Sequence, residues 1–175
     1  MADQATVTFQ YDPREDRLFL LLGPAEPPRV VCMTRRMTHR LASALAGALE
    51  RVNRPAQRAP ADLRDEVVRM THQGALAQAV RSESPWTVDA AARTGITAAL
   101  VTRVDVHLRG GGFTLELFSE EGGLASISSS AAEMHQILQV LLSFAEQADW
   151  NLGVAAPWLT ERRPGSPGQP AGLPQ

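Results

Sequence analysis

The order of apolar and polar positions near the start of the chain predicts three strands and a helix. Residues 7–11 alternate between apolar and polar types, which is typical of a half-buried strand. Two apolar runs, 18–22 and 29–33, follow turn-forming residues and predict two more strands, the first of them covered on both faces. Thr34 can then cap a helix that ends before Pro55. The apolar stripe of this helix is Met37, Leu41, Ala44, Leu45, Ala48, Leu49 and Val52.

The second half of the chain carries the same pattern. Residues 97–108 predict a long strand, and a glycine-rich turn predicts a tight hairpin into a strand at 113–118. A third strand is expected at 124–128. Ser130 and Glu133 have the spacing of a capping box and begin a helix. The apolar stripe of that helix is Met134, Ile137, Leu138, Leu141, Ala145 and Ala148.

The two patterns align as an internal repeat. From Phe19 onward the alignment needs no gap and has a constant offset of 96 residues, and one extra turn residue raises the offset to 97 upstream. The aligned positions include Phe9 with Val106, Tyr11 with Leu108, Phe19 with Leu115, Leu21 with Leu117, Val31 with Ile127, Thr34 with Ser130, and His39 with His135. The sequence therefore predicts an α+β fold of two pseudo-symmetric antiparallel β-β-β-α units, residues 6–53 and 97–150, joined by a connecting helix.

Residues 1–159 are expected to form a single globular domain. The connecting helix is expected at about 60–82, and its apolar side is Leu63, Val67, Met70, Gly74 and Ala77. Residues 83–95 are expected to be irregular, and the Pro/Gly-rich tail 160–175 to be disordered. Trp150 and Trp158 flank an apolar segment that either caps the core or docks on a neighbour, and we expect it to cap the core.

Composition narrows the function classes. The net charge is −2, which argues against bulk polyanion binding, and all 17 basic residues are arginine. Lysine-dependent chemistry, such as Schiff-base catalysis, is therefore excluded. Cys32 is the single cysteine, expected to be buried and inert. Without a leader-like start or a long apolar run, we expect a cytoplasmic protein with no membrane contact.

The best local candidate for binding is a set of arginines near the start of the first predicted helix. It comprises Arg29, Arg35, Arg36 and Arg40. Cations at this end oppose the helix dipole, whereas a bound anion would make them favourable. The alternative is that they pair with Asp12, Glu15 or Asp16, or lie in solvent.

Other chemistry finds less support in the sequence. The four histidines, His39, His72, His107 and His135, lack the spacing of a helical metal clamp, so we expect no metal and no cofactor. They are expected to be surface or partly satisfied side chains. Ser130 is explained as a helix cap rather than a nucleophile. Whether the protein is an enzyme stays open, and we expect that it is not.

The sequence thus predicts a non-enzymatic binding, adaptor or regulatory protein on a duplicated scaffold. A protein partner is preferred to nucleic acid. The alternative is a nucleic-acid or phosphate-ligand binding protein that uses the arginine set. The oligomeric state, a homodimer included, is left open.

Overall fold

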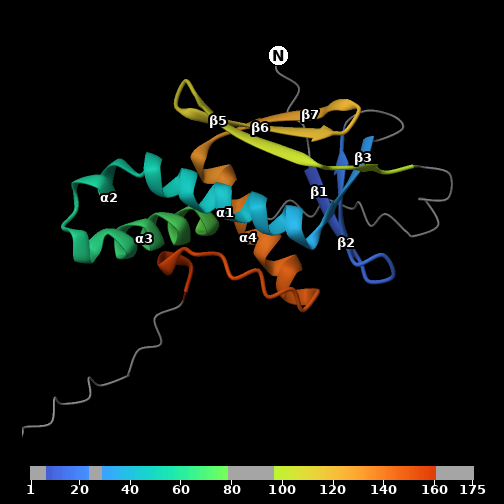
Figure 1. Cartoon of the computed structure of the whole chain (residues 1–175). Helices are drawn as coiled ribbons and strands as arrows, with labels where there is room; N and C mark the ends of the chain where they lie inside the picture. The colour runs from blue at the N-terminus through green and yellow to red at the C-terminus, as the bar shows by residue number, and fades with distance from the viewer. Residues whose placement is uncertain (1–6, 24–28, 79–96, 161–175) are drawn as a thin grey trace, which may run out of the picture.

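A computed structural model describes residues 7–23, 29–78 and 97–160 of the chain (Figure 1). Within these residues the fold is mixed α+β, with one four-stranded sheet, one three-stranded sheet and four α-helices. The predicted class is therefore confirmed. The bridge 83–95 and the tail beyond Thr160 lie outside the described residues, as does the end of the predicted connecting helix.

The first sheet consists of β1 (Val7–Asp12), β2 (Arg17–Leu22), β3 (Arg29–Thr34) and β4 (Ala99–Leu100), in that order. The first three strands form an antiparallel meander. Strand β2 is buried on both faces, as its apolar run predicts. Leu18, Leu20 and Leu22 face the main core, whereas Phe19 and Leu21 form a second cluster with Val30 and Cys32.

Strand β4 connects the first sheet to the second. It pairs with β3 in parallel, and the next amide, that of Val101, donates to the Cys32 carbonyl at 2.9 Å. The following amide, that of Thr102, donates to the Phe118 carbonyl of the second sheet at 2.8 Å. The single strand predicted at 97–108 is therefore wrong. Its two parts pair with different sheets, and a periodicity pattern carries no information about pairing partners.

The second sheet is an antiparallel meander of β5 (Arg103–Arg109), β6 (Gly112–Ser119) and β7 (Gly122–Ser129). The turn between β5 and β6 has two central glycines, Gly110 and Gly111, with φ of 58° and 84°. Positive φ at both positions defines the tight hairpin turn that the glycines predict. Phe113, Leu115 and Leu117 of β6 point into the core and are buried.

Helices α1 (Arg35–Val52) and α4 (Ala131–Gln147) each follow the third strand of a meander and pack against each other (Figure 1). Both predicted caps are present. The Thr34 hydroxyl accepts from the Met37 amide at 3.3 Å, and Ser130 and Glu133 form a complete capping box. The main core joins the two sheets to both helices, and its fully buried members include Leu20, Leu41, Leu45, Leu115, Leu138 and Leu141. Burial of each such side chain contributes roughly 1.5–3 kcal/mol.

Between the two meanders lie α2 (Arg54–Arg58), a short 3₁₀ turn at Ala61–Leu63, and α3 (Arg64–Ala77). The predicted apolar side of the connecting helix is wrong. Met70 is 63% exposed, whereas Val68, His72 and Ala75 are buried. The inward side combines two apolar residues, Val68 and Ala75, with His72, which contacts His135 of α4. A search for apolar positions does not count a buried histidine.

The segment after α4 covers the core, as expected from its two tryptophans. Trp150 is 5% exposed and Trp158 is 1% exposed. The Trp150 indole donates to Asp16 Oδ1 at 2.7 Å, which ties the segment to the β1–β2 turn. A 3₁₀ turn at Pro157–Leu159 places Trp158 against α3.

The strand registers refine the sequence alignment of the two meanders. Leu20 pairs with Phe9 and Val31, and Leu115 pairs with Val106 and Ile127. The registers of the two meanders therefore match when Leu20 is set against Leu115, whereas the sequence alignment sets Phe19 against Leu115. None of the described helices is both long and apolar enough to cross a membrane.

Candidate functional site

Two of the predicted binding arginines line one depression. Arg35 and Arg36 form the first turn of α1, and with His39 they face Asn151 and Leu152 of the segment after α4. The depression has a volume of about 400 Å³. Arg35 Nη2 donates to the Asn151 carbonyl at 3.3 Å, so one guanidinium is already oriented along the rim.

The other two predicted arginines lie elsewhere. Arg29 begins β3, whereas Arg35 follows the end of that strand, so six residues or roughly 20 Å separate them. The Arg29 guanidinium donates to the Leu124 carbonyl of the second sheet. Arg40 is exposed on the next turn of α1 and does not line the depression. The structure therefore brings together Arg35 and Arg36 only.

The carboxylates expected as alternative partners are engaged differently. Asp16 accepts hydrogen bonds from the Tyr11 hydroxyl at 2.9 Å and from Trp150. In the part of the chain that the structure describes, ion pairs join Glu66 to Arg69, Asp105 to Arg103 and Glu116 to His107. None of them includes Arg35, Arg36 or Arg40, so within that part these three arginines have no carboxylate partner.

Two histidines form a buried pair that the sequence did not predict. His72 of α3 and His135 of α4 are 6% and 3% exposed, and their Nδ1 atoms are 3.1 Å apart. His72 Nε2 lies 3.4 Å from Gln139 Oε1, an acceptor, so His72 donates there and accepts at Nδ1 from the His135 Nδ1–H. Of the expectation that the histidines are surface or partly satisfied side chains, the surface alternative is wrong for this pair, whose rings are buried and hydrogen-bonded. His39, which has the same position in α1 as His135 has in α4, is partly exposed and lies 3.4 Å from Ser43 Oγ.

Burial sets the charge state of this pair. It lowers the pKa of His72, and the Gln139 contact opposes the shift only in part. Burial, followed by the neighbouring His72, lowers the pKa of His135 to about 4. Both rings are therefore neutral near pH 7, with Trp158 packed edge-on against them at centroid distances of 5.4 and 6.0 Å. The pair connects α3 to α4 and is part of the core.

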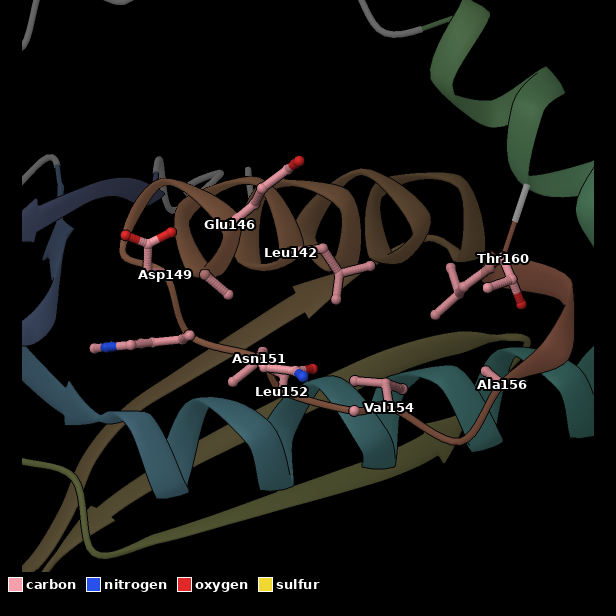
Figure 2. A pocket seen from close by; sticks show the side chains of 12 residues that line it. Leu142, Glu146, Asp149, Asn151, Leu152, Val154, Ala156 and Thr160 are labelled. Carbon is pink, nitrogen blue, oxygen red and sulfur yellow. The ribbon is translucent and has the colours of Figure 1, made fainter. Parts of the chain in front are cut away.

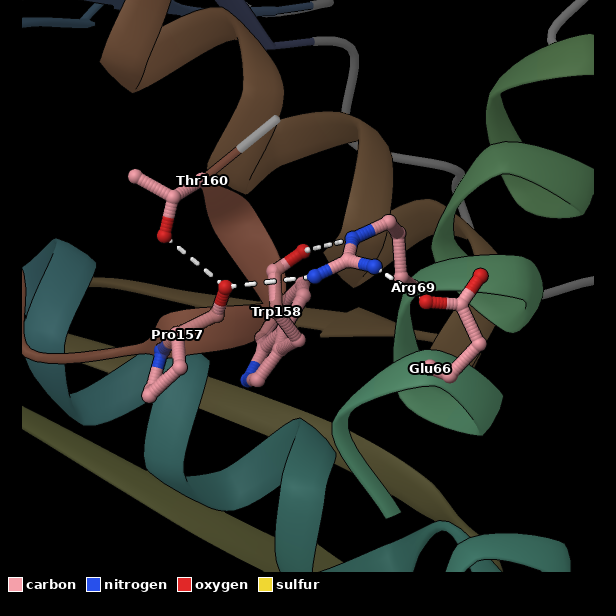
Figure 3. Close-up of polar contacts among 5 residues, drawn as sticks. All are labelled: Glu66, Arg69, Pro157, Trp158 and Thr160. Carbon is pink, nitrogen blue, oxygen red and sulfur yellow. Dashed lines mark hydrogen bonds and ion pairs between the residues drawn. The ribbon is translucent and has the colours of Figure 1, made fainter. Parts of the chain in front are cut away.

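The segment after α4 is held to the rest of the fold by polar contacts at its far end (Figure 3). The Arg69 guanidinium donates to the carbonyls of Pro157 and Trp158 at 3.4 and 3.3 Å and also pairs with Glu66. Between this end and Trp150, the segment and α4 enclose a second depression of about 460 Å³ (Figure 2). Leu142, Leu152 and Val154 contribute much of its apolar lining, and Glu146 and Asp149 lie at one end.

The outer face of the second sheet carries a third group of polar side chains. Asp105, His107 and Glu116 each have a potential ligand atom, and these atoms lie within 4.8 Å of one another. His107 Nε2 is 3.2 Å from Glu116 Oε2. Sequence reasoning missed this group because it counted histidines and helical spacings. The two-glycine turn contained the missing signal, since it pairs Arg109 with Gly112 and thereby places Asp105 opposite Glu116.

Comparison with known proteins supplies no identity for this chain. No protein-family model matches it, and no curated protein and no solved structure matches it.

Proposed function

We propose that this chain is a non-enzymatic binding or regulatory protein that holds an anionic group of a protein partner in the depression beside Arg35 and Arg36. The observation that carries the proposal is the placement of two guanidinium groups on one depression without a carboxylate partner in the described residues. Each guanidinium can donate two parallel hydrogen bonds to a carboxylate or phosphate.

The start of α1 supports the same proposal. Its first turn contains no acidic residue, so the partial positive charge of the helix end is not compensated by the chain itself. First-turn amides lack partners within a helix and are ready donors to an anion. The Thr34 hydroxyl accepts from one of them, that of Met37, and leaves the earlier amides of the turn to other acceptors.

The scaffold is proposed to be a duplicated, pseudo-symmetric β-β-β-α unit. Element order and the matching registers around Leu20 and Leu115 support this proposal. The positions in α4 that correspond to the arginines hold Ala131, Ala132 and Gln136. The anion site would therefore be used once, and the second unit would retain the scaffold alone.

A second candidate is a nucleic-acid or phosphate-ligand binding protein. Arg40 favours it, because this exposed residue continues the positive charge one turn along α1 from Arg36. The net charge of −2 disfavours a long polyanion. We therefore place the protein partner first.

The test uses the full chain and the double variant Arg35→Gln/Arg36→Gln. Probes are a glutamate-rich peptide, inorganic phosphate and a single-stranded oligonucleotide, titrated at low and at physiological ionic strength. The matched control is Arg54→Gln/Arg58→Gln, which removes two exposed arginines of α2 and the same net charge.

We expect peptide binding that the double variant loses and the control keeps. Preferential binding of inorganic phosphate or of the oligonucleotide, lost in the same variant and steeply weakened by salt, would establish the second candidate instead. Equal affinities in the double variant and the control would contradict both candidates.

A further inference from the structure

The register of the second sheet gathers one imidazole and two carboxylates on one surface. Asp105 of β5 pairs directly with Glu116 of β6, and His107 is two residues along the same strand. Successive side chains of a strand alternate between faces, and Val106 and Leu115 occupy the core side. The three polar side chains therefore share the outer face, which α1 and α4 do not cover.

The distances between these three side chains suit the coordination of one metal ion. Protein ligands about 2.1 Å from a zinc ion, at tetrahedral or octahedral angles, lie roughly 2.9–3.4 Å apart. His107 Nε2 and Glu116 Oε2 are 3.2 Å apart, within this range, and the Asp105 carboxylate is within 4.8 Å of both. Coordination of one ion would require the Asp105 carboxylate to move closer, and its side chain is 35% exposed, which leaves it room to do so.

Two carboxylates of this group face each other directly across the sheet. Like charges directly opposite each other across an antiparallel pair are destabilising, and Asp105 and Glu116 occupy such a pair. Arg103 compensates one of them: its Nε lies 3.3 Å from Asp105 Oδ2 while its guanidinium stacks over the Phe118 ring at 3.9 Å. A cation between the two carboxylates would compensate both at once.

We propose that Asp105, His107 and Glu116 form a binding site for a divalent transition-metal ion of the zinc type. Imidazole nitrogen with carboxylate oxygen is a donor set that suits zinc, whereas calcium and magnesium take oxygen ligands almost entirely. Three protein ligands leave at least one coordination position for water or for a donor group of a bound molecule. Arg103 competes with the ion for Asp105. The site lies on the second sheet and does not rest on the function proposed for Arg35 and Arg36.

The experiment is calorimetric titration of the untagged full chain with zinc chloride at neutral pH. We expect one equivalent of zinc to bind. His107→Ala and Glu116→Gln should each weaken binding at least about tenfold, since even the loss of a group that only supports a ligand costs 10–100-fold. Arg103→Gln should tighten binding by removing the competing cation. Circular dichroism verifies that each variant keeps the fold. We expect it to do so because the substituted side chains face solvent.

The matched control is His39→Ala, which removes another partly exposed histidine outside the group. It should bind zinc as the wild type does. A second readout is the visible absorption of bound cobalt(II), which should change with His107→Ala and not with His39→Ala. Absence of a stoichiometric zinc complex in the wild type, or equal losses in His39→Ala and His107→Ala, would overturn the proposal.

Discussion

The first turns of α1 and α4 occupy equivalent places, each directly after the third strand of a meander, yet they are built oppositely. Helix α4 begins with a complete capping box, and Glu133 places a negative charge at the positive end of the helix dipole. Helix α1 has the cap of Thr34 but begins with Arg35 and Arg36 and no acidic residue. The charge at the start of α4 stabilises that helix, whereas the charges at the start of α1 destabilise it at the place where we propose that an anion binds.

The same contrast continues one turn further along the helices. His135 of α4 is buried against His72, whereas its counterpart His39 of α1 is partly exposed beside the depression. A histidine at the same position of each helix is thus buried in α4 and partly exposed in α1. Local environment, rather than residue identity, decides what each histidine does.

The largest expected effect separates these two histidines. His135→Ala removes a buried ring and leaves His72 without its Nδ1 partner, so unfolding free energy should fall by roughly 2–4 kcal/mol. His39→Ala should change it by less than about 0.5 kcal/mol. Chemical denaturation of both variants measures the difference. Equal losses of unfolding free energy in the two variants would contradict the assignment of His135 to the core and of His39 to the surface.

The buried pair should make the stability of the fold depend on pH. Burial lowers the pKa of both rings, that of His135 to about 4, so the folded state binds protons less readily than the unfolded chain, whose histidines titrate near 6.5. The pair's stability is fully present above pH 6.5 and is lost as the pH falls from 6.5 towards 4. Melting temperatures across this window test it. His135→Gln, which does not titrate, should flatten the profile.

The caps should differ less than the histidines. Ser130→Ala removes the hydroxyl that accepts from the Glu133 amide and donates to the Glu133 carboxylate, and it should cost about 1 kcal/mol. The capping-box bond from the Ser130 backbone amide to the Glu133 carboxylate can still form. Thr34→Ala removes the single cap bond to Met37 and should cost the same or somewhat less. Urea denaturation of the two variants gives the comparison. A much larger cost for Thr34→Ala would show that the start of α1 depends on its cap more than the start of α4 does.

The last comparison concerns the helix dipoles, where each single charge has a small effect. Arg35→Gln/Arg36→Gln removes two opposing charges and should stabilise the ligand-free fold by about 0.3–1 kcal/mol for each charge. Ala131→Arg/Ala132→Arg should destabilise α4 by a similar amount. Both shifts should shrink at high salt. If the first double variant unfolds more easily than the wild type, the arginines stabilise the fold, and the anion proposal loses its main support.

The periodicity of apolar residues predicted those helices and strands that bury one regular apolar face in the core. The strands of both meanders, the hairpin at Gly110 and Gly111, and both caps follow from local residue types. The inward side of α3 was not predicted in this way, because it includes His72. The partner of His72, His135, is far away in the sequence. The break in the strand predicted at 97–108 has a similar cause.

The candidate sites were predictable to different degrees. The charge of Arg35 and Arg36 at a helix start is visible in the sequence, but the opposing wall at Asn151 and Leu152 is a tertiary feature. The same holds for the separation of Arg29, which depends on β3 forming as an extended strand. Asp105, by contrast, could have been paired with Glu116 from the glycine turn alone.

Between β4 and β5, hydrogen exchange of two neighbouring amides can show whether the two sheets open separately or together. The amide of Val101 is bonded to the first sheet and that of Thr102 to the second. In hydrogen–deuterium exchange, an opening confined to one sheet would expose one of these amides and spare the other. Their simultaneous exchange, at the rate of the slowest core amides, would mean that the two sheets separate only in global unfolding.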